Sequence, residues 1–234
     1  MVSKATQRGR QSLGSVVAAG VLAYLIGSVP SADLVSRWAA RRTGEAVDLR
    51  RAGTRNPGAM NAIGVLGPTW GSMVLVADIA KGAIASWLGR RIAGPKGAYI
   101  AGTAAVLGHC APVWSGFRGG KGVATSAGTC LVCFPAYAPI DVGVAVGIFR
   151  LSRGHVELAT YAASACFVTA ATYWWLKEKR NLWGPQPTFG LPLYALATSA
   201  LIAYRFLAPT ATSGSEQRSR PGGQSGEREI TAVA

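Results

Sequence analysis

Long apolar runs separated by short basic segments dominate the chain. Residues 13–35 carry a single charged side chain, Asp33, and residues 97–117 carry no Asp, Glu, Lys or Arg. Helical runs of about 20 apolar residues match the thickness of a bilayer. We therefore predict helices that cross a membrane over residues 13–35, 62–89, 97–117, 156–176 and 189–207.

The run at residues 122–149 carries Pro135 and Pro139 near its middle. Because proline interrupts a helix, this run is predicted to form two short spans joined by a turn. The predicted fold class is an all-α integral membrane protein of about seven transmembrane helices, some short or broken. We expect a basic N-terminal segment at 1–12, a single transmembrane domain at 13–207, and a disordered C-terminal tail at 208–234, which is rich in Ser, Gly and charge.

The formal charge of +14 falls mostly in the segments between the apolar runs. No aromatic-interleaved basic face or nucleic-acid motif accompanies it, so membrane lipid is the expected partner and nucleic acid is not. With the N-terminus outside, the inner side receives more Lys and Arg than the outer side, which favours that orientation. The Arg-rich segment 36–61 and the glycine-rich segment 108–122 then share the cytoplasmic face.

Residues 108–122, GHCAPVWSGFRGGKG, carry the most specific chemistry. Glycines at 116, 119, 120 and 122 surround Arg118 and Lys121, directly before another apolar run. Glycine lets successive N–H groups converge on one point, and a following helix adds its positive end there. This pattern indicates a site for phosphate or a similar oxyanion. It is not a P-loop, because glycine follows Lys121. The alternative is a basic glycine loop that merely joins two membrane helices.

Two other features have mainly structural interpretations. Asp78 and Lys81 lie three positions apart within an apolar run, so they share one helical face and are expected to pair. Cys130 and Cys133 form a CxxC, but no second pair or neighbouring histidines complete a metal site. We therefore predict no metal and no cofactor.

Three stretches resemble a known family, the small bacterial acyl-phosphate:glycerol-3-phosphate acyltransferases. They are AYLIGSVPS at 23–31, GTRNPGAMN at 53–61 with LVADIAKGA at 75–83, and GHCAPVWSGFRGGKGVAT at 108–125. The resemblance implies a seven-helix, multi-pass enzyme of the inner (cytoplasmic) membrane with its active face cytoplasmic. Such an enzyme moves a fatty acyl group from acyl phosphate to the 1-hydroxyl of glycerol 3-phosphate, in phospholipid synthesis. The resemblance implies no metal or coenzyme A, and it says nothing of protein partners.

The resemblance also suggests roles for individual residues. Lys121 in GGKG would lie beside the substrate phosphates, and Thr54 stands where the family usually has serine. His109 is interpreted as a proton carrier or as a hydrogen-bonded histidine that orients the loop. The predicted catalytic set is Thr54, His109 and Lys121, and the predicted substrate-binding set is Arg55, Asn56, Asn61, Arg118, Gly119, Gly120 and Gly122.

Several positions depart from the family's pattern. Gly64 stands where the family has arginine, and Phe206 and Pro209 replace the histidine and asparagine of its last span. The serine expected before the sixth span has no clear match. Arg55 stands where glycine is usual, and we hypothesise that its guanidinium replaces the one lost at position 64; the alternative is a surface cation. Two other functions stay open: a catalytically impaired paralogue that binds a lipid or polar phosphate, and a small transporter.

Overall fold

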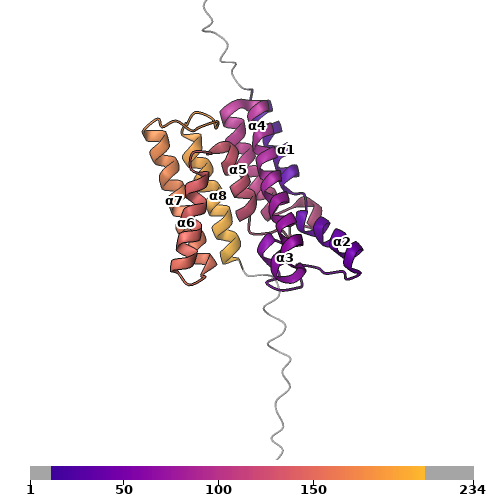
Figure 1. The fold of residues 1–234 in the computed structure, drawn as a ribbon. Coiled ribbons are helices and arrows are strands. Elements are labelled where there is room, and N and C mark those ends of the chain that lie inside the picture. The colour runs from indigo at the N-terminus through magenta and orange to yellow at the C-terminus, as the bar shows by residue number, and fades with distance from the viewer. Residues whose placement is uncertain (1–11, 209–234) are drawn as a thin grey trace, which may run out of the picture.

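The computed structural model describes residues 12–208, and every regular element in that range is a helix (Figure 1). The elements are α1 (Leu13–Gly27), α2 (Ser31–Thr43), α3 (Ala59–Leu66), α4 (Pro68–Cys110), the short 3-10 helix η1 (Val113–Ser115), α5 (Val123–Cys133), α6 (Ala138–Leu151), α7 (Val156–Leu176) and α8 (Gly190–Leu207). The predicted basic segment, apart from its last residue, and the predicted tail from Pro209 onward lie outside the described residues.

Helix α4 is two helices joined by a sharp reversal. Ala93 and Gly94 leave helical geometry, and Gly94 takes φ 57°, a left-handed value that glycine adopts without strain. Pro95 follows, where a missing N–H is harmless at the start of a new helix. The two arms, 68–92 and 95–110, together with α1, α5, α6, α7 and α8, give the seven helical segments that the sequence predicts.

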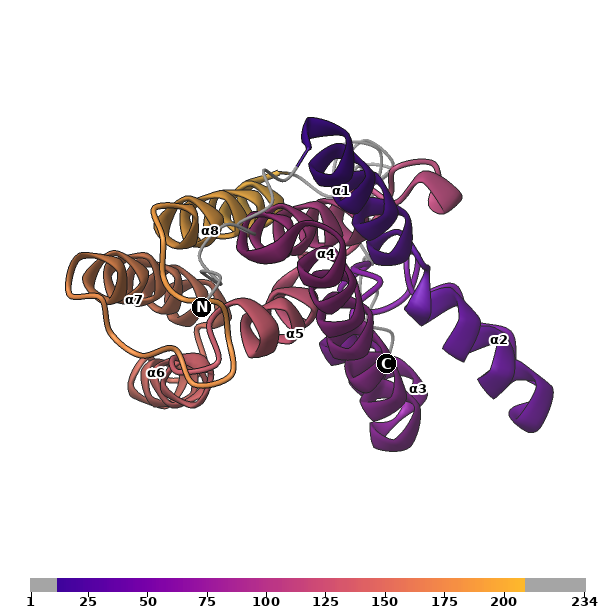
Figure 2. The same ribbon diagram turned by 90° about the horizontal axis from the view of Figure 1, so that it is seen from above.

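The arms of α4 lie between α1 and α5, and small residues allow this close approach (Figure 2). A Cβ on Gly27 of α1 would lie 2.2 Å from the carbonyl oxygen of Ala105, and a Cβ on Gly82 would lie 2.3 Å from that of Thr125. Such contacts are typical of membrane helices, where association depends on close packing rather than on burial from water.

Helices α6, α7 and α8 form a second group around an aromatic cluster. Phe134 stacks on Tyr137 at the end of α5, and Phe167 of α7 packs edge-on against Tyr194 of α8. The break between α5 and α6 confirms the predicted division of residues 122–149. The Asn181 amide donates to the carbonyl of Cys133 at this break and so satisfies a buried acceptor at the end of α5.

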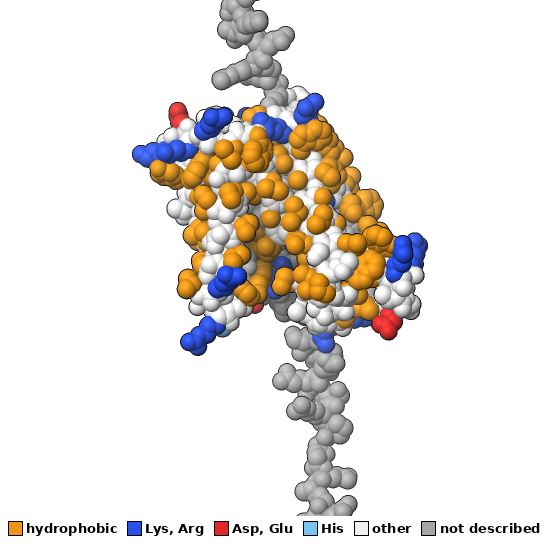
Figure 3. Space-filling view, viewed as in Figure 1, with side chains coloured by type: hydrophobic (Ala, Val, Ile, Leu, Met, Phe, Trp, Pro, Cys, Tyr) orange, Lys and Arg blue, Asp and Glu red, His pale blue; other side chains and the backbone are white. Residues whose placement is uncertain are grey.

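Charged side chains gather at the two ends of the molecule, whereas the flanks are largely apolar (Figure 3). Within residues 12–208, three helical segments are long and apolar enough to cross a membrane: Leu13–Thr43, Pro68–Ser115 and Gly190–Leu207. The second of them contains the reversal of α4. The apolar flank and these segments together agree with the predicted integral membrane protein.

Three predicted boundaries were wrong. The first span was predicted to reach residue 35, but α1 ends at Gly27 and α2 continues to Thr43, into the predicted polar segment. Helix α2 is amphipathic: it buries Ala32, Val35 and Ala39 while its arginines stay outside. The predicted run 62–89 breaks at Gly67, which has φ 92°, and the run 97–117 ends as a helix at Cys110. An average of apolar content over a window does not register such single-residue backbone breaks.

Candidate active site

The glycine loop, residues 111–122, connects α4 to α5 and folds back over the end of α4. The Gly120 N–H donates to the carbonyl of His109 at 3.1 Å. A Cβ on Gly119 would lie 2.0 Å from that same oxygen, and one on Gly120 would lie 2.3 Å from the His109 Nε2 atom. Glycine is therefore required at both positions by this close approach. Gly122 takes φ 89° where α5 begins, a conformation that also favours glycine.

His109 belongs to a buried polar cluster. Its Nδ1 atom lies 3.4 Å from the Asp78 carboxylate, which also pairs with the Lys81 ammonium at 2.9 Å. This confirms the predicted pairing of Asp78 with Lys81. The Lys81 ammonium also donates to the carbonyl of Val29 at 2.9 Å and lies 3.4 Å from the Ser31 hydroxyl. The cluster thus joins both arms of α4 to the break between α1 and α2.

A small cleft lies over this cluster, with a volume of about 20 Å³, little more than one water molecule needs. All the stretches that carry the family resemblance contribute to its lining, and Ala32, Asp33 and Arg50 add to it from outside them. The full lining is Gly27, Val29, Pro30, Ser31, Ala32, Asp33, Arg50, Pro57, Asp78, Lys81, His109, Pro112, Gly119 and Gly120. A larger groove of about 430 Å³ shares Asp33 and Arg50 with it and runs between α2 and residues 46–50.

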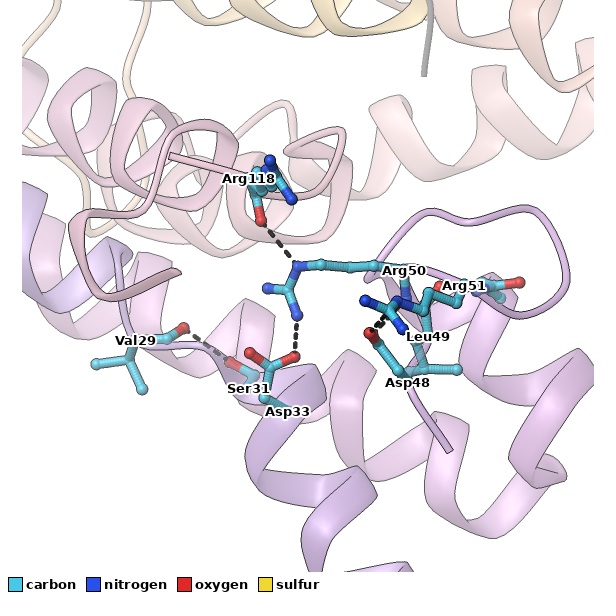
Figure 4. A network of polar contacts seen from close by, with 9 residues as sticks. Val29, Ser31, Asp33, Asp48, Leu49, Arg50, Arg51 and Arg118 are labelled. Carbon is cyan, nitrogen blue, oxygen red and sulfur yellow. Dashed lines mark hydrogen bonds and ion pairs between the residues drawn. The ribbon is translucent and has the colours of Figure 1, made fainter. Parts of the chain in front are cut away.

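Arg50 connects the two loops that the sequence places on one face. Its guanidinium pairs with the Asp33 carboxylate, and its Nε donates to the carbonyl of Arg118 at 3.1 Å (Figure 4). The Arg50 N–H donates to the Asp48 carboxylate at 2.9 Å, which shapes the turn that carries it. The arginine-rich segment and the glycine loop are therefore neighbours. Arg50 was not singled out from the sequence, where it is one of six arginines in its segment.

Asn61 lies in the first turn of α3, where its side chain bonds to the 44–58 loop and does not line the cleft. Its amide nitrogen donates to the carbonyls of Leu49 and Ala52, both at 3.0 Å, and its Oδ1 accepts from the Thr54 N–H at 2.7 Å. These three contacts tie the first turn of α3 to the loop and fix the loop's shape. Arg55 has φ 60°, which explains why glycine suits this position.

Lys121 points toward α8 and is not among the residues that line the cleft. Its ammonium lies 3.8 Å from the centre of the Phe206 ring. Partial burial lowers the pKa of Lys121 below its ordinary value; Arg205 acts in the same direction and Glu157 opposes it. Arg205 donates to the carbonyls of Gly120 at 3.1 Å and Gly119 at 2.7 Å, so the end of α8 also holds the loop.

The predicted site residues therefore fall into three places. His109, Gly119 and Gly120 line the cleft, and Lys121 and Gly122 lie at the start of α5. Arg118 contributes its main-chain carbonyl to the contact with Arg50 while its side chain is exposed. Thr54, Arg55 and Asn56 lie in the 44–58 loop, from which Arg50 and Pro57, but none of these three, line the cleft.

Three residues at the site were missed in the sequence: Ser31, Arg50 and Arg205. Ser31 follows Pro30 at the break between two apolar helices, and a polar residue at such a break was a usable signal. Arg205 carries the only charge in the last apolar run, which was a second signal. No pattern in the sequence distinguishes Arg50 from its neighbours.

Comparisons with known proteins identify the family of this chain. A family model described as "Glycerol-3-phosphate acyltransferase" matches residues 17–211. A glycerol-3-phosphate acyltransferase of Thermoanaerobacter pseudethanolicus is 35% identical over 159 residues, covering 68% of this chain and 77% of the relative. That of Symbiobacterium thermophilum is 39% identical over 157 residues, covering 67% and 75%.

Two solved structures share the fold. The glycerol 3-phosphate form of PlsY (YgiH), described as an integral membrane glycerol 3-phosphate acyltransferase, superposes with a TM-score of 0.68 at 31% identity. It covers 82% of this chain and 88% of that one. The lysophosphatidic acid form of the same protein gives a TM-score of 0.67 at 31% identity, covering 83% and 89%.

Proposed function

This chain belongs to the glycerol-3-phosphate acyltransferase family, and we propose that it moves a fatty acyl group from acyl phosphate to the 1-hydroxyl of glycerol 3-phosphate. The products are lysophosphatidic acid, a precursor of phospholipids, and inorganic phosphate. One observation carries the proposal: stretches far apart in the sequence, 27–33, 78–81 and 109–120, converge on one polar cleft at one end of an apolar helical bundle.

The residues present fit the chemistry of this reaction. The hydroxyl oxygen forms a bond to the acyl carbon, the bond from that carbon to the phosphate oxygen breaks, and the phosphate leaves and accepts the hydroxyl proton. Both substrates carry phosphate, and cations with fixed N–H donors stabilise the negative charge that develops. Lys121, Arg118 and the loop glycines 119, 120 and 122 are the proposed phosphate-binding groups.

The acceptor is proposed to approach from the side of the 44–58 loop, with Thr54, Arg55 and Asn56 around it. The 20 Å³ cleft is too small for glycerol 3-phosphate, and the groove of about 430 Å³ between α2 and residues 46–50, which shares Asp33 and Arg50 with the cleft, is the proposed entry route. His109 is proposed to orient the glycine loop, because its main-chain carbonyl and its ring both contact Gly120.

We further propose that this face is cytoplasmic and that the membrane is the inner membrane. The contact between Arg50 and Arg118 supports the first part, since it joins the arginine-rich segment to the glycine loop on one side. An excess of Lys and Arg on a face favours the cytoplasmic side.

A catalytically impaired paralogue that binds a phosphate-bearing molecule is the second candidate. Phe206 and the exposed Gly64 favour it, because neither offers a hydrogen-bond donor where the family's pattern has histidine and arginine. Loss of one donor to a developing oxyanion typically costs about 3 kcal/mol of transition-state stabilisation. The two candidates share a binding site and differ in turnover.

Phosphate release from acyl phosphate by the purified chain, with and without glycerol 3-phosphate, separates the two. We expect release that depends on the acceptor and falls at least about tenfold in Lys121→Met. Lys96→Met, which removes an exposed cation at the reversal of α4, is the matched control and keeps full activity. Acceptor-independent release, or none, in the unmodified chain would leave the impaired paralogue as the better account.

A further inference from the structure

Phe206 and Lys121 form a contact that the proposed reaction does not by itself explain. The Lys121 ammonium lies 3.8 Å from the centre of the Phe206 ring, well inside the range of a cation–π contact. The two residues lie 85 positions apart, one just before α5 and the other in the last turn of α8. The contact therefore depends on how α8 packs beside the glycine loop.

The ring itself is held in place. Phe206 packs against the buried group Val106, Cys110 and Ile202, and the Tyr161 ring meets it edge-on at 6.2 Å between centres. Its neighbour Arg205 donates to the carbonyls of Gly119 and Gly120. One turn of α8 thus positions both the backbone of the glycine loop and the side chain of Lys121.

The kind of contact matters for an anion-binding lysine. Within residues 12–208, no hydrogen bond or ion pair engages the Lys121 ammonium. A carboxylate partner would occupy its N–H donors and cancel its charge. An aromatic face attracts the cation through the ring quadrupole without cancelling its charge, so the N–H donors that point away from the ring stay available to phosphate oxygens.

We propose that Phe206 is a positioning residue, which holds the Lys121 ammonium beside the glycine loop so that it meets a substrate phosphate without losing conformational entropy on binding. This rests on the proposed function, since it takes a phosphate-bearing substrate as the ligand. A free lysine side chain loses rotamer entropy when it is fixed, and a preformed contact reduces that loss on binding.

The test measures binding of glycerol 3-phosphate to the full chain in nanodiscs by titration calorimetry. Phe206→Met removes the ring while keeping an apolar side chain of similar volume, and the dissociation constant is expected to rise about three- to tenfold. Phe206→Tyr keeps the ring and should bind within about twofold of the unmodified chain. Trifluorophenylalanine at position 206 keeps the shape but withdraws charge from the ring face, and should match Phe206→Met.

The same Phe206 substitution in a Lys121→Met variant distinguishes a role in positioning Lys121 from a role in helix packing. In Lys121→Met, the further change Phe206→Met should alter binding less than about twofold, because the group on which the ring acts is gone. Leu201→Ala disturbs the same apolar cluster without contacting Lys121, and should lower the unfolding temperature while leaving binding unchanged. An equal loss from Phe206→Met in both backgrounds, or normal binding with the fluorinated ring, overturns the inference.

The role of Phe206 and the proposed acyl transfer are tested by separate measurements. A chain that binds glycerol 3-phosphate with this coupling but transfers no acyl group refutes the transferase activity and leaves the role of Phe206 intact. A chain that transfers acyl groups without this coupling refutes the role of Phe206 alone. Failure of the unmodified chain to bind glycerol 3-phosphate overturns the inference, while the acyl-transfer assay decides the function.

Discussion

The Lys81 ammonium group lies 2.9 Å from the main-chain carbonyl oxygen of Val29, although 52 positions separate the two residues. Val29 lies where α1 has ended and α2 has not begun, so its carbonyl accepts only the Ser31 N–H from the main chain and has room for the lysine. Lysine deep in a membrane helix is costly unless it is paired, and here it satisfies both this carbonyl and Asp78. The break that opens the cleft is thereby stabilised.

Lys81→Met should strongly destabilise the protein, because it leaves the Asp78 carboxylate, 2% exposed, without its cation. Breaking a buried pair in this way costs about 3–5 kcal/mol. The double variant Asp78→Asn/Lys81→Met should unfold at a higher temperature than Lys81→Met alone, since no unpaired charge remains. Thermal unfolding in detergent followed by tryptophan fluorescence measures both, with the exposed Arg51→Met as control. A double variant less stable than Lys81→Met would contradict this account.

Gly120→Ala should displace the His109 ring, because the new Cβ would lie 2.3 Å from its Nε2 atom. We expect kcat/KM for acyl transfer to fall at least about tenfold, as small displacements of positioned groups have effects of this size. Gly64→Ala is the matched control: nothing lies within 4 Å of its Cβ position, and α3 should gain about 0.5–1 kcal/mol. Full activity in Gly120→Ala would show that the loop tolerates a shifted histidine.

Arg55 combines a strained backbone with a candidate binding role. Its φ of 60° costs a non-glycine residue about 1–2 kcal/mol, so Arg55→Gly should be more stable than Arg55→Ala by roughly that amount. Both variants lack the guanidinium, and both should bind glycerol 3-phosphate several-fold more weakly. Chemical denaturation and calorimetry measure the two effects. Unchanged binding in both would remove Arg55 from the substrate-binding set and leave it a surface cation.

Asn61→Asp should loosen the 44–58 loop. Aspartate keeps the acceptor for the Thr54 N–H but cannot donate to the carbonyls of Leu49 and Ala52. The Ala52 carbonyl keeps the Arg55 N–H, but the Leu49 carbonyl loses its donor; leaving it unsatisfied costs about 1–3 kcal/mol, which should appear as faster hydrogen exchange and proteolysis in residues 44–58. Asn56→Asp makes the same chemical change at a half-exposed amide and should leave exchange unaltered. Equal exchange rates in both variants would argue against the structural role of Asn61.

The order of the long helices could be predicted from the sequence, because each of them depends on residues that are close together in the chain. Apolar run length specifies the spans, and Pro135 and Pro139 mark the break between α5 and α6. The pairing of Asp78 with Lys81 was equally accessible, since positions three apart lie on one face of a helix. The glycines at 119, 120 and 122 indicated a tightly turned loop for a similar reason.

The tertiary structure alone decided which side chains meet. Asn61 was predicted to bind substrate, and the structure shows its amide bonded to three main-chain groups of the neighbouring 44–58 loop. Lys121 looked like a member of the cleft, but it lies over Phe206 instead. Such contacts join residues 85 positions apart and depend on how helices pack, a nonlocal property that hydrophobic periodicity does not encode. The sequence determined the helices and the chemistry of the loop; helix packing determined which groups of that loop face the cleft.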